Sequence, residues 1–343
     1  MEFAVVGAGA AGLAAGRYLS SLGRRFIILE SGYRIGDSWR HRYSGLRLFT
    51  PARFCALPDL PMPMPDSDYP DKDQVADYLE RYARRCDFPI RLNAAVREHH
   101  LTGAGAHRLT GDNFSISADR VIVATGAHGA PNIPSFADEL GGHVRQVHSG
   151  QYHDEADLKS GPVLVVGAGP SGADISASLA LDRDVWLAGP ATGQLPLALM
   201  SSPAFRRLVY QRRIPSGALG KRVRRAFGAH GAPLVRQSEA TLRVAGVGRA
   251  PEMVGVRDGK PLLADGRVLD VANVIWCTGF RPDFGWLDGR AVGPDGWPRQ
   301  RRGVSDALPG LGFVGLPRQN TVGSGYLSGM AGDARYVVKR LGR

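Results

Sequence analysis

Two glycine-rich runs in the sequence have the pattern Gly-x-Gly-x-x-Gly, which is typical of dinucleotide-binding sites. They span residues 7–12 and 167–172. Each run follows a short apolar stretch, residues 3–6 or 163–166, and precedes a run of small residues, so each predicts a strand, a tight turn and a helix. In that arrangement the glycines let the backbone approach a pyrophosphate, and the helix N-terminus offers N–H groups and a positive dipole end. The two runs therefore predict two bound dinucleotides.

The two predicted sites differ where the adenosine ribose would lie. The offset from Gly7 to Glu30 equals the offset from Gly167 to Pro190. Glu30 follows a predicted strand, and its carboxylate can accept both ribose hydroxyls, which indicates an adenosine site for FAD or NAD. Pro190 offers neither a carboxylate for a 2′-hydroxyl nor a guanidinium for a 2′-phosphate. The second dinucleotide is thus left open between NADH and NADPH.

The composition is that of a soluble globular protein. The chain has 343 residues, 43% hydrophobic and 22% charged, a length that allows two domains with separate cores. No stretch approaches the roughly 20 continuous apolar residues of a membrane span. A predicted strand begins at residue 3, so we expect no signal peptide and a cytoplasmic location. Cys55, Cys86 and Cys277 form no C-x-x-C pair, and we find no convincing metal-ligand cluster.

The net charge of +11 is concentrated in one segment. Residues 206–225 contain no acid, and their basic residues are Arg206, Arg207, Arg212, Arg213, Lys221, Arg222, Arg224 and Arg225. Phe205, Leu208 and Val209 recur at helical spacing. The segment is therefore either a basic amphipathic helix, on an acidic membrane surface or against cofactor phosphates, or a solvated helical face. We do not expect nucleic acid as a partner, because no aromatic interleaving or known module accompanies the charge.

Strand and helix signals alternate along the chain, which predicts an α/β fold with doubly wound parallel sheets. We expect two Rossmann-like, three-layer dinucleotide-binding domains, the second inserted into the first. Residues 1–158 and 278–343 are assigned to an FAD-binding domain. Residues 159–277 are assigned to an NAD(P)-binding domain with a basic insertion near 194–231.

Local patterns predict four further features. A helix is expected over residues 72–86, where apolar residues recur on one face, and a last helix is expected to begin near Ser328. A buried strand that ends in Ala-Thr-Gly at 124–126 has a near copy that ends in Cys-Thr-Gly at 277–279, which is an internal repeat. The polar, glycine-rich stretch around His99, His100 and His107 is interpreted as a solvated hairpin.

Together these residues resemble the flavin-containing monooxygenases, the class B flavoprotein monooxygenases, and most closely the short bacterial CzcO-type NAD(P)/FAD-dependent oxidoreductases. The resemblance spans essentially the whole chain. Besides the fingerprints and the Thr-Gly turns, it rests on residues 36–40 (GDSWR), 46–50 (LRLFT), 71–75 (DKDQV), 276–282 (WCTGFRP) and 315–317 (GLP). It implies FAD in the first domain, NADPH and/or NADH in the second, and O2 as the oxidant of a small-molecule substrate.

The resemblance also implies which residues contact the cofactors. The FAD pyrophosphate is expected on Gly7, Gly9, Ala11 and Gly12, and the FAD ribose on Glu30. The rest of the FAD site is expected to comprise Ser38, Trp39, Arg40, Leu48, Thr50, Val96, Ala124, Thr125, Gly126, Gly315 and Gln319. For Trp39 a place in the core is the alternative. The nicotinamide cofactor is expected on Gly167, Gly169, Ser171 and Gly172, with Pro190 at its ribose. The helix near Ser328 is expected to direct its N-terminus at the flavin pyrimidine ring, where it stabilises negative charge.

The linker signature of the family, F-x-G-x-x-x-H-x-x-x followed by an aromatic residue, is half kept. His148 and Tyr152 are present, whereas Gly142 and Val144 replace the Phe and the first Gly. Tyr152 implies the heteroatom-oxygenating branch rather than the Baeyer–Villiger branch. His148 is interpreted as a hinge and linker residue, not as an acid or base.

Two departures from the family bear on the chemistry. Pro51 stands where many members have an Asn near the reactive edge of the flavin, which weakens the expected protection of a C4a-hydroperoxyflavin. Gly189-Pro190 stands where close bacterial relatives have Gly-Arg, whose Arg would fork a 2′-phosphate. The sequence therefore predicts weak discrimination between NADH and NADPH, unless an arginine of the basic segment reaches the phosphate.

The implied function is an FAD-dependent NAD(P)H monooxygenase that oxygenates a sulfide or amine through a C4a-(hydro)peroxyflavin. No protein nucleophile is required, and Thr50 and Tyr152 are the candidates expected near the flavin. The alternatives are an NAD(P)H oxidase or flavin reductase that releases peroxide, and a flavin-binding redox sensor. The substrate, a homodimeric assembly and peripheral membrane contact through residues 206–225 stay open.

Overall fold

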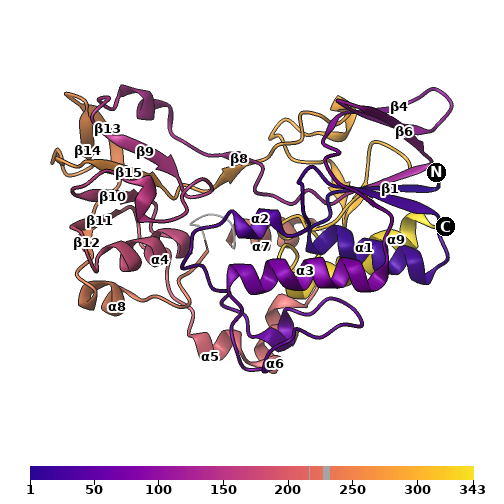
Figure 1. The fold of residues 1–343 in the computed structure, drawn as a ribbon, viewed down its shortest axis with the longest axis horizontal. Helices are drawn as coiled ribbons and strands as arrows, with labels where there is room; N and C mark the ends of the chain where they lie inside the picture. Colours follow the sequence, from indigo (N-terminus) through magenta and orange to yellow (C-terminus); the bar gives the residue numbers. More distant parts are fainter. Residues whose placement is uncertain (216, 227–231) are drawn as a thin grey trace.

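The computed structural model describes residues 1–215, 217–226 and 232–343. Its elements form two units that lie next to each other along the long axis of the molecule (Figure 1). In the described part of the chain, the first unit is built on a seven-stranded sheet and the second on a five-stranded sheet. The expected α/β fold with two dinucleotide-binding units is confirmed.

The first sheet has the strand order β17-β18-β19-β7-β1-β2-β3 and is parallel from β19 to β3. In its centre, β1 (Phe3–Val6) lies between β2 (Phe26–Leu29) and β7 (Arg120–Val123). All four residues of β1 are buried, as expected for an apolar strand covered on both faces. The other strands are β3 (Ile90–Arg91), β17 (Gln300–Arg301), β18 (Val304–Ser305) and β19 (Leu311–Phe313).

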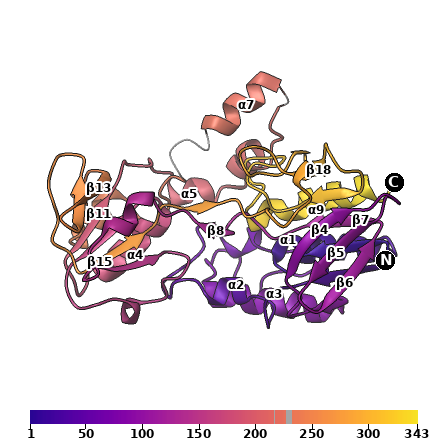
Figure 2. The same cartoon turned by 90° about the horizontal axis from the view of Figure 1, so that it is seen from above.

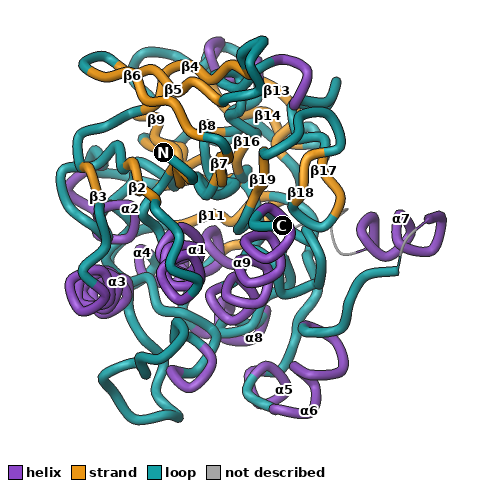
Figure 3. The backbone as a smooth tube through the Cα atoms, turned by 90° about the vertical axis from the view of Figure 1, so that its right-hand side faces the viewer, coloured by secondary structure: helices purple, strands orange, loops and turns teal. Residues whose placement is uncertain are grey.

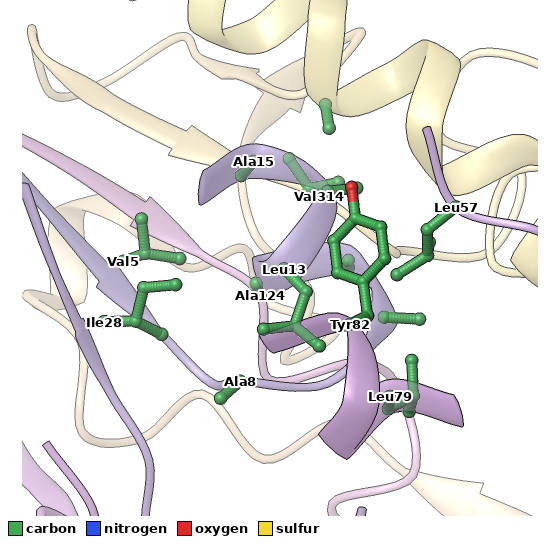
Figure 4. Close-up of a cluster of buried hydrophobic side chains, with 14 of the residues drawn as sticks. Val5, Ala8, Leu13, Ala15, Ile28, Leu57, Leu79, Tyr82, Ala124 and Val314 are labelled. Carbon is green, nitrogen blue, oxygen red and sulfur yellow. The ribbon is translucent and has the colours of Figure 1, made fainter. Parts of the chain in front are cut away.

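Three helices cover one face of this sheet and lie next to one another in Figure 3. They are α1 (Ala10–Ser21), α3 (Lys72–Cys86) and α9 (Leu327–Leu341), and α1 packs against both others. The expected helix over 72–86 and the expected start of the last helix are confirmed. A capping box of Asp71 and Gln74 fixes the start of α3. Figure 4 shows Leu13 of α1 and Tyr82 of α3 packed with Val5 and Ile28 of the sheet.

The opposite face is covered by an antiparallel sheet of β4 (Val96–Leu101), β5 (His107–Gly111) and β6 (Phe114–Ala118). The expected hairpin is present, but its expected exposure is wrong for His99 and His107, because the inner face of the sheet buries both completely. Nε2 of His99 lies 2.9 Å from Nδ1 of His107. His100 points outward and is exposed.

The second sheet has the order β12-β11-β10-β15-β9, and all its pairings are parallel. Its strands are β9 (Arg145–His148), β10 (Val163–Val166), β11 (Val185–Ala188), β12 (Gly248–Ala250) and β15 (Asn273–Trp276). One face packs against α4 (Pro170–Leu179) and α8 (Glu239–Val244). The other face packs against the hairpin of β13 (Met253–Arg257) and β14 (Lys260–Leu263).

The boundary between the units lies earlier than residue 158, where the sequence placed it. β9 pairs with β15, so residues 145–148 belong to the second sheet. This strand is short, and its partner lies far along the chain, which is why local patterns do not assign it. Two connections cross between the units and pair with each other as β8 (Ala130–Pro131) and β16 (Phe280–Arg281), seen between the units in Figure 1.

The basic insertion leaves the second unit and packs partly on the first. Its described elements are α5 (Leu197–Met200), α6 (Pro203–Phe205), a π-helical turn (Arg206–Tyr210) and α7 (Gly217–Ala226). The N–H of Gly323 donates to the Tyr210 carbonyl at 2.9 Å, which ties the turn to the loop before α9. Helix α7 projects from the body of the molecule (Figure 2). Residues 227–231 of the predicted insertion lie outside the described residues.

The charge run is not uniformly solvated. Arg206 is only 1% exposed, with its guanidinium carbon 4.3 Å from the centre of the Phe54 ring, whereas Arg207, Arg212 and Arg213 are exposed. Arg206 therefore does not lie on a solvated helical face, which contradicts that reading of the run at this position. None of the helices within the described ranges is long and apolar enough to cross a membrane.

Short helical turns complete the fold. They are α2 (Asp37–Arg40) and the 3-10 turns Ala52–Phe54, Ser135–Glu139, Glu155–Asp157 and Gly289–Ala291.

Candidate cofactor and active site

The first fingerprint forms an open cradle at the end of β1. Gly7 has φ of +101°, and a Cβ there would lie 2.8 Å from the Ala124 carbonyl oxygen. A Cβ at Gly12 would collide with the Gly7 carbonyl, so both positions require glycine for close packing. At Gly9 a Cβ would meet nothing within 4 Å. The free space at Gly9, in front of an uncapped helix N-terminus, fits the approach of a pyrophosphate.

The carboxylate of Glu30 is held over this cradle. Its Oε2 accepts the N–H of Ala8 at 2.7 Å, and its Oε1 accepts the N–H of Gly32 at 2.9 Å. Because Glu30 follows β2 directly, the side chain stands where the ribose of a bound adenosine is read. The position agrees with the role that the sequence predicts for Glu30.

The end of the chain returns to the same cradle. Gly315 follows β19 with φ of +90°, and a Cβ there would lie 2.9 Å from the Cβ of Ala11. Gln319 is buried, and its amide closes the turn by donating to the Phe313 carbonyl at 2.8 Å and accepting the N–H of Leu316 at 3.3 Å. The Gln319 side chain thus shapes the loop before α9, and α9 itself has no side-chain cap.

Within residues 36–50, Arg40 and Gly36 both contact helix α3. The Arg40 guanidinium points at α3, where Nη2 lies 2.8 Å from Asp77 and 3.0 Å from Glu80. Arg40 therefore positions the loop through α3, and the expectation that it borders FAD stays a prediction. Gly36 allows this packing, because a Cβ there would lie 2.7 Å from the Ala76 carbonyl oxygen.

The remaining predicted FAD residues differ in burial and in the clusters that they contact. Trp39 and Leu48 pack against the core that contains Ala8, Ala10 and Ala11, which agrees with the core alternative for Trp39. Thr50 is buried, Ser38 is exposed, and Val96 lies at the start of β4 against the Leu29 cluster. Ala124, Thr125 and Gly126 form the turn that follows β7 beside Gly7.

The second fingerprint repeats the geometry of the first. Gly167 has φ of +108° and lies against the Cys277 carbonyl, as Gly7 lies against Ala124. A Cβ at Gly172 would collide with the Gly167 carbonyl, and a Cβ at Gly169 would meet nothing within 4 Å. The internal repeat seen in the sequence is therefore the same turn built twice, once at each cradle.

Strand register corrects the predicted ribose position of the second cradle. Val6 pairs with Leu29 in the first unit, and Val166 pairs with Ala188 in the second. The residue that corresponds to Glu30 is therefore Gly189, and Pro190 lies one position beyond it. The offset from the first glycine is one residue shorter in the second unit, because α4 has 10 residues against 12 in α1, while the connection to the next strand, residues 180–184 against 22–25, is one residue longer.

The linker histidine holds the two crossing segments together. Its Nε2 lies 2.9 Å from the Gly279 carbonyl, and its Nδ1 accepts the N–H of Gly150 at 3.0 Å. A carbonyl only accepts and an amide only donates, so His148 is neutral with its proton on Nε2. Burial lowers the pKa of His148, which favours that neutral form. This geometry agrees with a hinge role.

Tyr152 does not reach the flavin side. It is 5% exposed and lies in the core of the second unit with Val163, Val165 and Ala168. Tyr43 of the first unit does reach the second, because its hydroxyl lies 3.4 Å from Oδ2 of Asp174 on α4. The expectation that Tyr152 borders the flavin is wrong, because this segment turns back under the second sheet after β9.

A cavity of about 490 Å³ opens between the two units. Arg47, Tyr69 and Gln74 of the first unit and Leu197 and Arg236 of the second are among its lining residues. A smaller space beside it reaches Pro170, the first residue of α4, so the opening leads to the second fingerprint. No sequence motif indicates Arg236, since it follows a segment without a recognisable pattern.

An apolar cluster lies at the boundary between the two units. Tyr326 packs edge-on against Phe49 and beside Tyr210, with ring centres 5.6 Å and 5.8 Å away. Met200 and Val235 complete the buried part of the cluster. These side chains come from both units and form an apolar environment at the boundary between them.

Two dinucleotide cradles on interleaved α/β units define a flavin- and nicotinamide-dependent oxidoreductase. The comparisons agree. Residues 4–191 match the family described as pyridine nucleotide-disulphide oxidoreductase, and the chain belongs to this family. Cys55, Cys86 and Cys277 are all free thiols.

Full-length relatives narrow the class. The chain is 35% identical to an uncharacterised CzcO-like oxidoreductase of Geobacillus kaustophilus, covering 98% of this chain and 97% of the relative. It is 30% identical to a probable indole-3-pyruvate monooxygenase, YUCCA3, of Arabidopsis thaliana, covering 86% and 77%. The solved flavin-containing monooxygenase of Stenotrophomonas maltophilia is 26% identical with a TM-score of 0.80, covering 99% and 98%. The protein is an enzyme of the flavin monooxygenase type that uses FAD and NAD(P)H.

Proposed function

We propose that the protein is a monooxygenase that inserts one oxygen atom of O2 into a small apolar substrate at a soft nucleophile, a sulfide sulfur or an amine nitrogen. The observation that carries the proposal is the apolar boundary of Phe49, Tyr210 and Tyr326, to which both units contribute side chains. Such a site excludes water and suits an apolar substrate.

FAD, when bound, supplies the redox chemistry, which is acceptance of hydride and activation of O2. The protein supplies binding and position. Gly9 and Gly169 leave room for the two pyrophosphates, and Glu30 orients the ribose of FAD. The balanced reaction consumes substrate, O2, NAD(P)H and a proton, and yields oxygenated substrate, water and NAD(P)+.

The arginines of the cavity favour a second candidate substrate. Arg47 and Arg236 are exposed and line the same cavity, and the N–H of Arg236 Nη1 donates to the Arg47 carbonyl at 3.3 Å. Two guanidinium groups beside an apolar cluster fit an aromatic acid. An aromatic 2-oxo acid, the substrate class in the printed name of the plant relative, is therefore the second candidate.

The test compares oxygen transfer with uncoupled turnover. The FAD-loaded protein is supplied with NADPH and 18O2 and offered aryl sulfides, tertiary amines and aromatic 2-oxo acids. We expect labelled product from one class, formed in proportion to NADPH consumed. If NADPH is consumed and hydrogen peroxide forms without product from any class, the protein acts as an NAD(P)H oxidase, which Pro51 favours because a proline has no N–H to offer at the flavin edge.

A redox-sensor role makes a different prediction. A sensor without turnover holds its flavin oxidised for a long time in the presence of NADPH. Rapid anaerobic bleaching of the flavin contradicts that role.

A further inference from the structure

The edge strand of the second sheet places a cation at the turn where a nucleotide ribose would be read. Arg249 lies in β12, next to β11. Its Nη1 donates to the Leu187 carbonyl at 2.8 Å, and its Nη2 donates to the Gly189 carbonyl at 3.0 Å. The guanidinium is therefore fixed over the carboxyl end of β11 before any ligand arrives.

The carboxyl end of β11, over which the guanidinium lies, corresponds to the end of β2 where Glu30 stands in the first unit. Glu30 and Gly189 each follow the last paired residue of the strand next to the fingerprint strand. A Cβ at Gly189 would lie 3.5 Å from the amide nitrogen of Ala168, as the Glu30 carboxylate lies against the amide of Ala8. A carboxylate at this place accepts ribose hydroxyls and repels a 2′-phosphate, whereas glycine leaves the space free.

The Arg249 guanidinium also pairs with the Glu239 carboxylate, which a phosphate could replace. Its Nε lies 3.3 Å from Oε2 of Glu239, and the two side chains are 32% and 54% exposed. An exposed ion pair of this kind adds little stability. A phosphate dianion that replaces Glu239 gains charge-assisted hydrogen bonds from a guanidinium already held by two carbonyls.

We propose that Arg249 recognises the 2′-phosphate of NADPH. The inference rests on the proposed function only in that the second cradle binds a nicotinamide dinucleotide. Arg249 supplies the cation that the sequence lacks at residue 190, and it comes from β12, outside the basic segment 206–225. Glu239 is the opposing group, because its carboxylate competes with the phosphate for the same guanidinium.

Isothermal titration of the FAD-loaded protein with 2′,5′-ADP and with 5′-ADP tests the proposal without turnover. For the unchanged protein we expect 2′,5′-ADP to bind about tenfold tighter or more, as one charge-assisted contact of about 1.4 kcal/mol requires. Arg249→Gln should reduce this ratio to about two or less. The matched control is Arg243→Gln, an exposed arginine of α8, which should leave the ratio unchanged.

Glu239→Gln provides a test in the opposite direction, which remains valid if Arg249→Gln fails to fold. Removal of the competing carboxylate should tighten 2′,5′-ADP about threefold or more and leave 5′-ADP unchanged. Equal binding of both nucleotides by the unchanged protein overturns the proposal. So does a Glu239→Gln variant that binds 5′-ADP more weakly, because Glu239 would then be reading the ribose hydroxyl of NADH.

The same titration separates this inference from the proposed function. If the yellow, folded protein binds neither nucleotide, the assignment of the second cradle is wrong, and the proposed function is wrong with it. If 2′,5′-ADP is preferred but no substrate is oxygenated, the Arg249 inference stands and only the proposed reaction is wrong.

Discussion

The N–H of Ala8 donates to Oε2 of Glu30 at 2.7 Å, which fixes the carboxylate after β2 above the first glycine-rich turn. The same oxygen atoms are the acceptors that an adenosine ribose requires. Glu30 therefore orders the turn through Ala8 and Gly32, and we propose that it also orients the FAD ribose.

Glu30→Ala should weaken FAD binding by roughly 1.5 to 3 kcal/mol, the range for loss of a hydrogen bond to a charged group. Glu30→Gln is the matched control, since it keeps the size of the side chain and removes the charge. Its FAD affinity should lie between that of the unchanged protein and that of Glu30→Ala. Titration of the apoprotein with FAD, followed by flavin fluorescence, gives both affinities. An unchanged FAD affinity in Glu30→Ala would place the ribose contact elsewhere.

The open spaces at Gly9 and Gly169 predict two variants with opposite behaviour. Neither position has an atom within 4 Å of an added Cβ, so Gly9→Trp and Gly169→Trp should both fold. Gly9→Trp should purify colourless, because the indole fills the approach path of the FAD pyrophosphate. Gly169→Trp should stay yellow but resist bleaching by NADPH. Absorbance spectra before and after anaerobic NADPH decide the result, and a yellow, FAD-replete Gly9→Trp protein would refute the assignment of the first cradle.

The features that the sequence predicts correctly are local ones. The strands before both fingerprints, helix α3 and the start of α9 depend on apolar runs, helical spacing and a capping box within a few residues. The Thr-Gly repeat was also recognisable, because each copy is one strand followed by one turn.

The features that the sequence missed depend on contacts between distant segments. The burial of Arg206 requires the first unit to lie against the insertion. The place of Tyr152 follows from the pairing of β9 with β15. The position of Arg249 at the second ribose site follows from pairing with β11, and no motif near residue 249 announces it.

The buried histidine pair predicts a pH-dependent stability. Burial, with a smaller effect of His107, lowers the pKa of His99 to about 4, against 6.5 when unfolded. The unfolded chain therefore binds a proton below pH 6.5 that the folded chain refuses, and stability is lost as the pH falls from 6.5 toward 4. At pH 5 the suppressed protonation of His99 lowers the free energy of unfolding by roughly 2 kcal/mol relative to its value above pH 6.5.

Urea unfolding at pH 8 and pH 5 measures this effect. The loss of unfolding free energy between the two pH values should be smaller in His99→Gln than in the unchanged protein by roughly that amount. His100→Gln, at the neighbouring exposed position, should behave like the unchanged protein. Equal losses of unfolding free energy in all three proteins would show that His99 binds a proton as readily in the folded state as in the unfolded state.

The last prediction concerns residue 190, which is an exposed proline in this chain. Since Gly189 aligns with Glu30, residue 190 lies one position beyond the ribose and within reach of a 2′-phosphate held by Arg249. Pro190→Arg should add a second guanidinium to that phosphate. It should shift the preference toward NADPH by about tenfold or more, equivalent to at least 1.4 kcal/mol.

The measured quantity is the ratio of second-order rates of anaerobic flavin reduction by NADPH and by NADH. Pro190→Gln is the control, because it removes the same proline ring without adding charge, and it should leave the ratio near that of the unchanged protein. In the Arg249→Gln background, Pro190→Arg should restore a preference for NADPH, because either cation can serve the same phosphate. If Pro190→Arg leaves the ratio unchanged in both backgrounds, the 2′-group does not lie at this turn, and the alignment of Gly189 with Glu30 does not describe how the second dinucleotide binds.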